Sequence, residues 1–356
     1  MELSIAKADP SRMKPKPKDE ATLGFGRYFS DHMFVMRHAQ GRWQDPRIVP
    51  YANFEMDPAA MVFHYGQAIF EGMKAYRGKD GGIYLFRPGA NMERMNNSAA
   101  KLCMPEFDGE FVLNAMKDLV NLDRDWIPRT HGSALYIRPT MIADEPALGV
   151  RPSATYIFFI IVGPVGAYYP EGFNPVKIYV SDEHVRAVRG GVGEAKTAAN
   201  YAASLYAAEK AKKAGFTQVL WLDAVERRYV EEVGTMNIFF LMGDELITPP
   251  LRGSILPGVT RDSVIRVARD IGCMVVERNI TVDEVVEGCK SGTLKEVFGT
   301  GTAAVISPVG EISYKDRAHA VGDGKTGPLA TRLFNYLLSL QYAEIEDPYG
   351  WVKKIG

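Results

Sequence analysis

The chain has 356 residues, 46% of them hydrophobic and 24% charged, and its formal net charge is −1 at pH 7. This composition indicates a globular protein of about two domains and gives no sign of a protein that binds nucleic acid or a membrane surface. The longest apolar run, residues 157–165, is too short to cross a bilayer, and Cys103, Cys273 and Cys289 lack paired spacing. We therefore expect a protein of the reducing cytoplasm that binds no metal ion.

The first half of the chain predicts an extended arm followed by a small domain. Residues 1–25 contain Lys-Pro-Lys-Pro-Lys and no apolar segment that could serve as a signal sequence, so we expect an extended N-terminal arm. Residues 26–162 alternate strand-like and helical patterns, which predicts a smaller α/β domain. Its expected strands are residues 83–86, 134–138 and 155–162, and its expected helices are residues 88–102 and 109–122.

The second half predicts a larger domain. Residues 163–175 are rich in turn-forming residues and are the expected interdomain loop, and residues 176–356 form the expected C-terminal domain. Strands and helices interleave without a regular βαβ repeat, so the sequence favours an α+β fold over a doubly wound sheet. The expected strands are residues 176–180, 218–222, 236–241, 274–278 and 296–298, and the expected helices are residues 198–214, 259–271, 282–288 and 328–342.

Lys196 follows three glycines in the stretch from Gly190 to Tyr201 and directly precedes a helical pattern. A lysine at such a junction indicates either a nucleotide-binding P-loop or a nucleophilic lysine that forms a Schiff base. The P-loop pattern fails at Ala195, and residues 181–189 separate the stretch from its strand, whereas a P-loop follows its strand directly. A lysine in an ordinary loop is the third interpretation.

Three further stretches have features of a site for an anionic cofactor. Residues 256–261 open a helix after a glycine, where free N–H groups suit a phosphate, although an ordinary helix cap is the simpler interpretation of this stretch alone. Residues 299–304 form a second loop of small residues at a strand end. Residues 231–237 place two adjacent acids before an apolar strand, and a solvated turn would explain them equally well.

Pyridoxal phosphate requires the groups that these stretches supply. Its aldehyde needs a lysine, its phosphate needs backbone donors, and its ring nitrogen needs a carboxylate that keeps it protonated. Tyr201 lies five residues after Lys196 and can reach the ring oxygen. Taken together, these residues favour a pyridoxal phosphate enzyme.

The sequence also resembles the branched-chain amino acid aminotransferases, which are two-domain, fold-type IV pyridoxal phosphate enzymes of the D-amino acid aminotransferase-like architecture. The resemblance runs from about Phe29 to the C-terminus and rests on several motifs in the same order. These motifs are residues 70–75, 91–95, 136–139, 190–201, 232–237, 256–259 and 298–303. Some family members have a Cys-x-x-Cys motif after the last of these, but this chain has Ala304 and Ser307 there, so thiol regulation at that place is not expected.

The resemblance implies a role for each matching residue. Lys196 would bind the cofactor as a Schiff base and move a proton between substrate and cofactor. Glu232 would pair with the pyridine nitrogen, and Tyr201 with the phenolic oxygen. The remaining cofactor residues would be Arg94, Val259, Thr260 and Thr302 at the phosphate and Arg186 beside the ring. The substrate residues would be Phe29, Tyr65, Phe70, Tyr136 and Arg138, with Val150 from a partner subunit and main-chain groups of Thr235 and Ala303. Core packing is the alternative for each aromatic residue.

The resemblance further implies the reaction and the partners. Leucine, isoleucine or valine would pass its amino group to 2-oxoglutarate by a ping-pong mechanism, in a cytoplasmic homodimer whose active sites are completed across the interface. The partners would be small amino acids and 2-oxo acids, with no nucleic acid and no membrane. D-amino acid transaminases and aminodeoxychorismate lyases share the fold, so fold alone does not settle function. Residues 136–138 and 232–237 favour the branched-chain function, and a P-loop ATPase is the alternative from another class.

Overall fold

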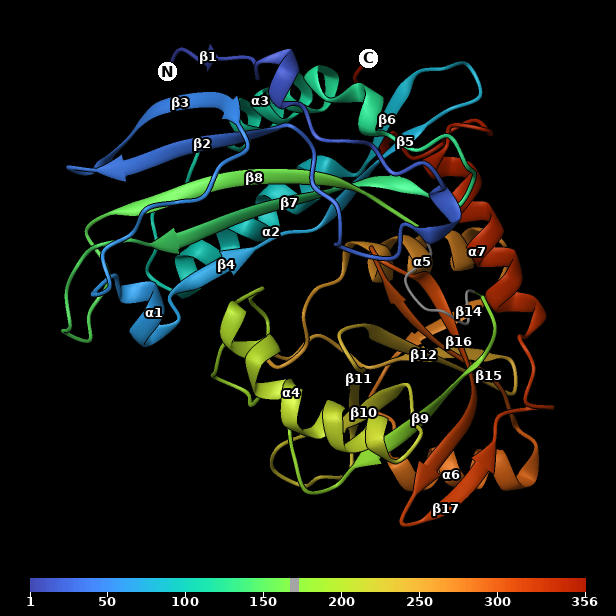
Figure 1. Ribbon diagram of the computed structural model, residues 1–356. Helices are drawn as coiled ribbons and strands as arrows, with labels where there is room; N and C mark the ends of the chain where they lie inside the picture. The colour runs from blue at the N-terminus through green and yellow to red at the C-terminus, as the bar shows by residue number, and fades with distance from the viewer. Residues whose placement is uncertain (167–172) are drawn as a thin grey trace. The chain divides into compact units, whose positions relative to one another are not determined.

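The computed structural model of the chain describes residues 1–166 and 173–356, and these residues form two compact units (Figure 1). The first unit includes residues 1–166, Ala195–Ala199 and Ser339–Gly356. The second unit includes residues 173–194 and Asn200–Leu338. Each unit has its own sheet, and the chain returns from the second unit to the first twice, at Ala195–Ala199 and at Ser339–Gly356.

The sheet of the first unit is almost wholly antiparallel. Its strand order is β1-β3-β2-β8-β7-β5-β6-β18, with β4 paired to β7. Among the described strands of this unit, only β1 and β3 pair in parallel. The strands are β1 (Ser4–Ile5), β2 (His32–Ala39), β3 (Arg42–Pro50), β4 (Ala68–Phe70), β5 (Met73–Arg77), β6 (Ile83–Phe86), β7 (Ala134–Ala143), β8 (Tyr156–Val165) and β18 (Val352–Lys354).

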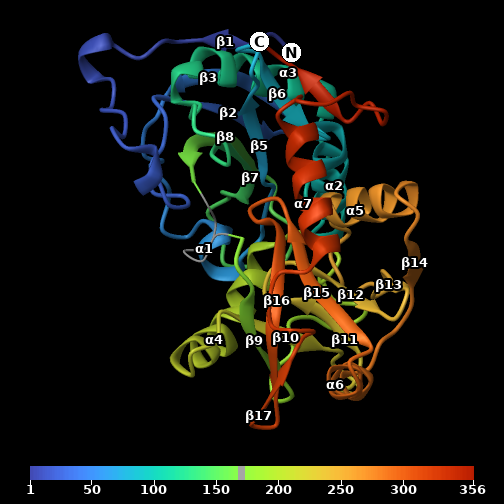
Figure 2. The same cartoon turned by 90° about the vertical axis from the view of Figure 1, so that its right-hand side faces the viewer.

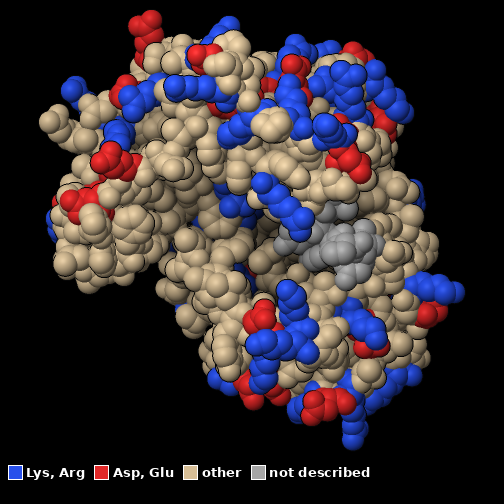
Figure 3. All heavy atoms as spheres, viewed as in Figure 1, with Lys and Arg blue, Asp and Glu red and all other residues tan. Residues whose placement is uncertain are grey.

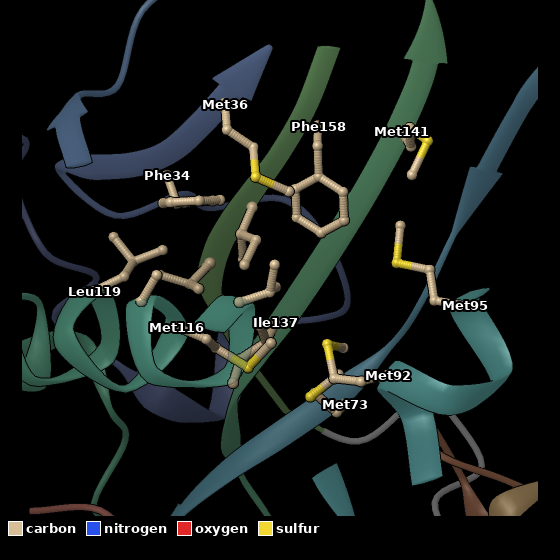
Figure 4. Close-up of a cluster of buried hydrophobic side chains, with 14 of the residues drawn as sticks. Phe34, Met36, Met73, Met92, Met95, Met116, Leu119, Ile137, Met141 and Phe158 are labelled. Atoms are coloured by element: carbon tan, nitrogen blue, oxygen red, sulfur yellow. The ribbon is translucent and has the colours of Figure 1, made fainter. Parts of the chain in front are cut away.

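Two helices, α2 (Pro88–Lys101) and α3 (Gly109–Leu122), lie on the same side of this sheet (Figure 2). The Asp108 carboxylate begins α3 by accepting hydrogen bonds from the N–H groups of Glu110 and Phe111. The buried residues of α3 recur at helical spacing and are Val112, Ala115, Met116, Leu119 and Val120. Figure 4 shows helical side chains packed toward the strands, and those it labels are Met92 and Met95 of α2 and Met116 and Leu119 of α3. The labelled side chains of the strands are Phe34, Met36, Met73, Ile137, Met141 and Phe158.

The remaining helices of the first unit are short. They are α1 (Met61–Tyr65) and the 3₁₀ helices η1 (Pro10–Arg12), η2 (Glu20–Thr22) and η3 (Arg124–Trp126). The C-terminal residue of α1 is followed by Gly66, which has a φ of 62° and ends the helix in the left-handed conformation.

The sheet of the second unit mixes parallel and antiparallel pairs, with the order β11-β10-β9-β16-β15-β12-β13-β14 and β17 paired to β16. Strand β9 is parallel to both β10 and β16, and β13 is parallel to β14. This mixture confirms the α+β expectation. The strands are β9 (Val176–Ser181), β10 (Gln218–Leu222), β11 (Val230–Val233), β12 (Asn237–Met242), β13 (Glu245–Thr248), β14 (Met274–Glu277), β15 (Leu294–Gly301), β16 (Val305–Tyr314) and β17 (Arg317–Ala320).

Helices α4 (Ala198–Lys213) and α6 (Val282–Ser291) lie on opposite sides of the strands of the second unit (Figure 2). Ala207 and Ala211 of α4 pack against Val219 and Trp221 of β10. The other helices are α5 (Val259–Asp270) and α7 (Pro328–Gln341). The first residues of α4 belong to the first unit, and so do the last residues of α7.

The division of the chain differs from the expected boundaries at its C-terminal end. Residues 339–356 were expected in the C-terminal domain, but they belong to the first unit because β18 pairs with β6. Residues 163–165 of the expected interdomain loop lie in β8, and residues 167–172 of it fall outside the described part of the chain. The first unit thus combines segments that are far apart in the sequence, such as β6 and β18.

The N-terminal arm is held against the first unit at several points. Strand β1 pairs with β3, and the Ala8 N–H donates to Nε2 of the buried His32 at 2.8 Å. The Lys14 ammonium donates to the Ser30 carbonyl at 2.7 Å, and the Lys14 N–H donates to the Asp31 carboxylate at 2.7 Å. Residues 1–25 are therefore anchored to the first unit, and they include the two 3₁₀ helices η1 and η2.

Acidic and basic side chains are interspersed on the face shown in Figure 3, in agreement with the formal net charge of −1. Within the described residues, no helix combines the length and apolar content needed to cross a membrane. The same residues contain no group of three His, Cys, Asp or Glu side chains placed to hold a metal ion.

Candidate active site

The first unit fixes the backbone of Lys196 on both sides. Its N–H donates to the Ser98 hydroxyl of α2 at 2.9 Å, and its carbonyl accepts from the Phe70 N–H at the end of β4 at 3.1 Å. Thr197 forms an isolated bridge with Ile69 of the same strand. Lys196 is half-buried, and its Nζ lies 5.0 Å from the centroid of the Phe70 ring. The lysine is therefore held by long-range contacts, unlike a residue of an ordinary surface loop.

Arg138 lies over the same aromatic ring. Its guanidinium carbon is 4.7 Å from the Phe70 centroid and 5.2 Å from the Tyr136 centroid, and its Nη2 donates to the Tyr136 hydroxyl at 3.1 Å. A Cβ atom at Gly72 would clash with that hydroxyl, so glycine is required beside Tyr136. Arg138 forms no ion pair with a carboxylate of the described residues, and its buried Nε has no hydrogen-bond partner there. A positive charge beside aromatic rings is thus left for a ligand.

Arg94 of α2 is paired with the fully buried Glu71. Its Nε and Nη2 donate to the two carboxylate oxygens at 2.7 and 2.8 Å, and Asn91 donates to the same carboxylate at 2.9 Å. Burial alone raises the pKa of Glu71, but Arg94, the nearby Lys196 and Asn91 more than offset it, so that this pKa lies below its usual range. Glu71 therefore holds the guanidinium of Arg94 in one orientation.

The other substrate residues of the first unit lie near its surface. The Tyr65 hydroxyl donates to the Leu148 carbonyl at 2.6 Å, and Val150 is 86% exposed. Phe29 stacks on Tyr51 at 5.7 Å between ring centroids. The ring of the N-terminal segment that contacts Tyr136 is Phe25, at 4.8 Å, and the sequence offered no motif that singled out Phe25.

In the second unit, four residues expected at the cofactor and substrate line one small pocket. They are Arg186, Tyr201, Glu232 and Thr235, and the rest of the lining is Asn200, Ser204, Gly234 and Leu256. Tyr201 lies in the first turns of α4 and Glu232 in β11, so a helix and a strand from distant parts of the sequence meet at this pocket.

Glu232 is 3% exposed and accepts from two side chains. Arg186 Nη2 is 2.5 Å from Oε2, and Asn237 Nδ2 donates to Oε1 at 3.0 Å. Asn237 also donates to the Leu256 carbonyl at 2.9 Å, which connects the acid to the loop before α5. The carboxylate is therefore held in one orientation beside a cation, as suits a partner of a protonated ring nitrogen.

The N-terminus of α5 offers a site for a phosphate. Its N-cap is Gly258, which has no side chain to accept from the first N–H groups, and a Cβ atom there would clash with Asn237. Val259 and Thr260 are the first two residues of the helix, where N–H groups and the helix dipole favour an anion. Thr302 and Ala303 lie in the turn between β15 and β16. The donor set of the second unit fits pyridoxal phosphate: anion-binding amides, a phenol and a buried carboxylate.

The family profile described as amino-transferase class IV matches residues 68–312. The chain belongs to this family. Aminotransferases of this class have the fold-type IV architecture that the sequence predicted, and the structural likeness given next confirms it.

Two class IV relatives from Bacillus subtilis (strain 168) are similar to this chain over nearly its whole length. Branched-chain-amino-acid aminotransferase 2 is 54% identical, with 97% of this chain and 95% of that protein covered. Branched-chain-amino-acid transaminase 1 is 52% identical, with 96% of each chain covered.

Two solved class IV structures share the fold. The branched-chain amino acid aminotransferase of Escherichia coli has a TM-score of 0.76 and 27% identity, with 92% of this chain and 99% of that chain covered. The T.th. branched-chain amino acid aminotransferase with pyridoxamine 5′-phosphate has a TM-score of 0.75 and 29% identity, with coverages of 91% and 98%. Membership of the family excludes the P-loop interpretation of the Lys196 stretch.

Four residues near the site were not assigned a role from the sequence: Glu71, Ser98, Asn237 and Ser254. Glu71 and Asn237 lie inside quoted motifs, and an acid within the apolar segment around Phe70 was a usable signal. Ser98 and Ser254 gave no signal, because their importance comes from contacts with residues far away in the sequence.

Proposed function

We propose that this chain is a pyridoxal phosphate-dependent branched-chain amino acid transaminase. It transfers the amino group of leucine, isoleucine or valine to 2-oxoglutarate, which gives glutamate and a branched-chain 2-oxo acid. The observation that carries the proposal is the 52–54% identity, over at least 95% of each chain, to two relatives with this name. The unpaired Arg138 beside aromatic rings agrees with it, because the site must accept both an apolar and an anionic side chain.

Lys196, Glu232, Tyr201 and Arg186 are proposed to hold the ring of the cofactor. When bound, pyridoxal phosphate supplies an aldehyde that reacts with a primary amine and a ring that withdraws electrons from the substrate. Lys196 binds that aldehyde and moves the proton at the substrate α-carbon. Glu232 keeps the ring nitrogen protonated, Tyr201 donates to the phenolic oxygen, and Arg186 orients Glu232 through the 2.5 Å ion pair.

The phosphate is proposed to be held by Arg94, Val259, Thr260 and Thr302. In the first unit Arg94 supplies a guanidinium that Glu71 orients. In the second unit the N-terminus of α5 supplies backbone donors, which need no deprotonation and bind an anion at any working pH.

The substrate side chain is proposed to lie against Phe29, Tyr65, Phe70 and Tyr136. An aromatic lining excludes water from the side chain of leucine, and the Arg138 guanidinium meets the distal carboxylate of 2-oxoglutarate at the edge of that lining. Main-chain groups of Thr235 and Ala303 bind the α-carboxylate, which leucine and 2-oxoglutarate share.

The working protein is proposed to be a cytoplasmic homodimer. Four large apolar side chains are exposed around α1 and the loop before β8: Phe63, Tyr65, Leu148 and Val150, at 61%, 39%, 67% and 86%. A second copy of the chain covers this surface and completes the active site with its Val150. Residues 26–162 and 176–356 remain the proposed boundaries of the two domains, apart from Ala195–Ala199 and the C-terminal segment described above.

A panel of amino donors with 2-oxoglutarate tests the proposal. We expect glutamate formation with leucine, isoleucine and valine, little with D-amino acids, and a visible absorption band of the lysine-bound cofactor. Size-exclusion chromatography with light scattering should give twice the chain mass of 39.4 kDa. ATP hydrolysis without a visible band, or activity confined to D-amino acids, would refute the assignment.

A further inference from the structure

Two adjacent acids are buried on β11 in the second unit. Glu231 is 6% exposed and Glu232 is 3% exposed, although successive side chains of a strand point to opposite faces. Glu232 is paired with Arg186 and Asn237. The proposed function uses Glu232 and leaves Glu231 without a role.

Glu231 has its own contacts. The Ser254 hydroxyl donates to its Oε1, and its buried Oε2 has no hydrogen-bond partner among the described residues. A buried carboxylate oxygen without a donor is costly when the group is ionised, but much less so when the acid carries a proton. The contacts therefore favour the neutral acid in the chain as it stands.

Arg186 and Ser254 connect the two acids. Arg186 Nη2 lies 2.5 Å from Glu232 Oε2 and donates to the Ser254 carbonyl at 2.5 Å. Ser254 thus contacts Glu231 through its hydroxyl and Arg186 through its carbonyl. A change of charge at Glu231 acts on Glu232 through this short series of contacts.

The surrounding charges act on Glu231 in both directions. Burial is the largest effect and raises the pKa of Glu231, and the charge of Asp223 raises it further. The Ser254 hydrogen bond and the charges of Arg186 and Arg189 lower this pKa. The net pKa lies above the usual value. An additional positive charge nearby would reverse this balance and favour the ionised acid.

The bound cofactor introduces such a charge. Without it, Arg186 balances Glu232 and Arg189 balances Asp223, so a neutral Glu231 leaves the cluster uncharged. When a protonated pyridine ring binds beside Glu232, two cations, the ring and Arg186, share the single carboxylate of Glu232. This excess positive charge is unfavourable in a buried site. Ionisation of Glu231 restores neutrality.

We propose, on the basis of the proposed function, that Glu231 is a positioning residue that gives up its proton when the protonated cofactor ring binds. The proton passes to solvent or to the ring nitrogen, and the two carboxylates then balance Arg186 and the ring. Glu231 touches neither cofactor nor substrate. It acts by leaving Glu232 with a full negative charge for the ring nitrogen.

Proton counting during cofactor binding tests this proposal. Pyridoxal phosphate is titrated into cofactor-free protein by calorimetry in two buffers of different ionisation enthalpy, for wild type, Glu231→Gln and Glu226→Gln. Glu226 is an exposed acid in the hairpin before β11 and is the matched control. We expect the wild type and Glu226→Gln to release about one proton more per bound cofactor than Glu231→Gln. Equal proton counts for the wild type and Glu231→Gln overturn the proposal.

A second variant keeps the acid and changes only its hydrogen bond. Ser254→Ala removes the donor that favours the ionised Glu231, so proton release should persist but its midpoint should move to higher pH. An unchanged midpoint, with folding confirmed by circular dichroism, also overturns the proposal.

The visible spectrum separates this inference from the proposed function. The wild type can bind pyridoxal phosphate through Lys196 and transaminate leucine while it releases as many protons as Glu231→Gln. In that case only the proposed role of Glu231 is wrong. If the wild type gives no visible band with the cofactor, the proposed function itself is wrong.

Discussion

Replacing Arg138 with methionine tests how one site accepts both leucine and 2-oxoglutarate. Leucine needs an apolar lining, whereas 2-oxoglutarate brings a second carboxylate that is costly to bury without a partner. Arg138 lies over Phe70 and Tyr136 and forms no ion pair among the described residues. It is therefore not part of a structural ion pair within the described residues. Methionine keeps most of the length and apolar surface of the arginine and removes only the charge.

The expected loss follows from the surroundings of the guanidinium. Two unit charges about 4 Å apart attract by about 4 kcal/mol at an effective dielectric constant of about 20. Hydrogen bonds to a charged group contribute about 1.5–3 kcal/mol. Arg138 is half-buried, so the expected loss is about 2–4 kcal/mol. This range corresponds to a decrease in kcat/KM for 2-oxoglutarate of about 30-fold to roughly 1000-fold.

Single-turnover absorbance measurements follow each half-reaction separately. In Arg138→Met the half-reaction with 2-oxoglutarate should slow by the amount above, while the half-reaction with leucine should stay within about threefold of wild type, less than ~1 kcal/mol. Arg151→Met is the control, because Arg151 is exposed and pairs with Glu145 at 2.7 Å. Equal losses for leucine and 2-oxoglutarate would refute the reasoning and show that Arg138 supports the fold.

Four further outcomes are expected. Lys196→Ala should lose the visible band of the lysine-bound cofactor and several orders of magnitude of turnover, and an intact band in the spectrum would contradict the assignment. Glu232→Gln should slow single turnovers more than threefold, because the neutral amide cannot hold the ring proton; a smaller effect would exclude Glu232 as the ring partner. Glu71→Gln should lower the unfolding free energy at pH 7 by about 3–5 kcal/mol, because Arg94 loses a buried partner. Since the pKa of Glu71 is lowered by folding, this difference should shrink as the pH falls below about 4.3, and a gap independent of pH would contradict it. Mass spectrometry after a thiol reagent at pH 8 should show no modification of Cys289, because burial raises its pKa to about 11.

The helices were predictable because local signals determine them. The expected helix at residues 109–122 is α3, which has an aspartate N-cap and a regular apolar face. The expected helix at 88–102 is α2, which ends one residue earlier, at Lys101. Both helices are specified by residues three and four positions apart, which the sequence displays directly.

Two of the missed strands have sequences that local preference does not assign to a strand. Strand β11 has the sequence Val-Glu-Glu-Val, which suggested a solvated turn, but all four residues are buried. Strand β16 contains Pro308 and Gly310 and was not expected, yet it pairs with β15, β9 and β17. Tertiary contacts override local preference in both cases.

The motifs located the candidate site, but not the contacts that hold it together. Lys196, Tyr201 and Glu232 followed from the chemistry of the cofactor and from the resemblance. The resemblance also supplied Arg186, but not its contact with Glu232, and nothing in the sequence indicated the contact of Ser98 with Lys196, because both pairs join segments that are far apart in sequence. Roles that depend on the tertiary fold are therefore the part that the sequence alone cannot supply.

The discontinuous first unit has a consequence for synthesis of the chain on the ribosome. Strand β18 pairs with β6 and belongs to segment Ser339–Gly356, which emerges after the whole second unit. The second unit can therefore complete its sheet during translation, while the edge of β6 stays exposed until the final segment is released. An unpaired strand edge is prone to intermolecular pairing, so slowed translation of the segment that contains β18 should increase aggregation.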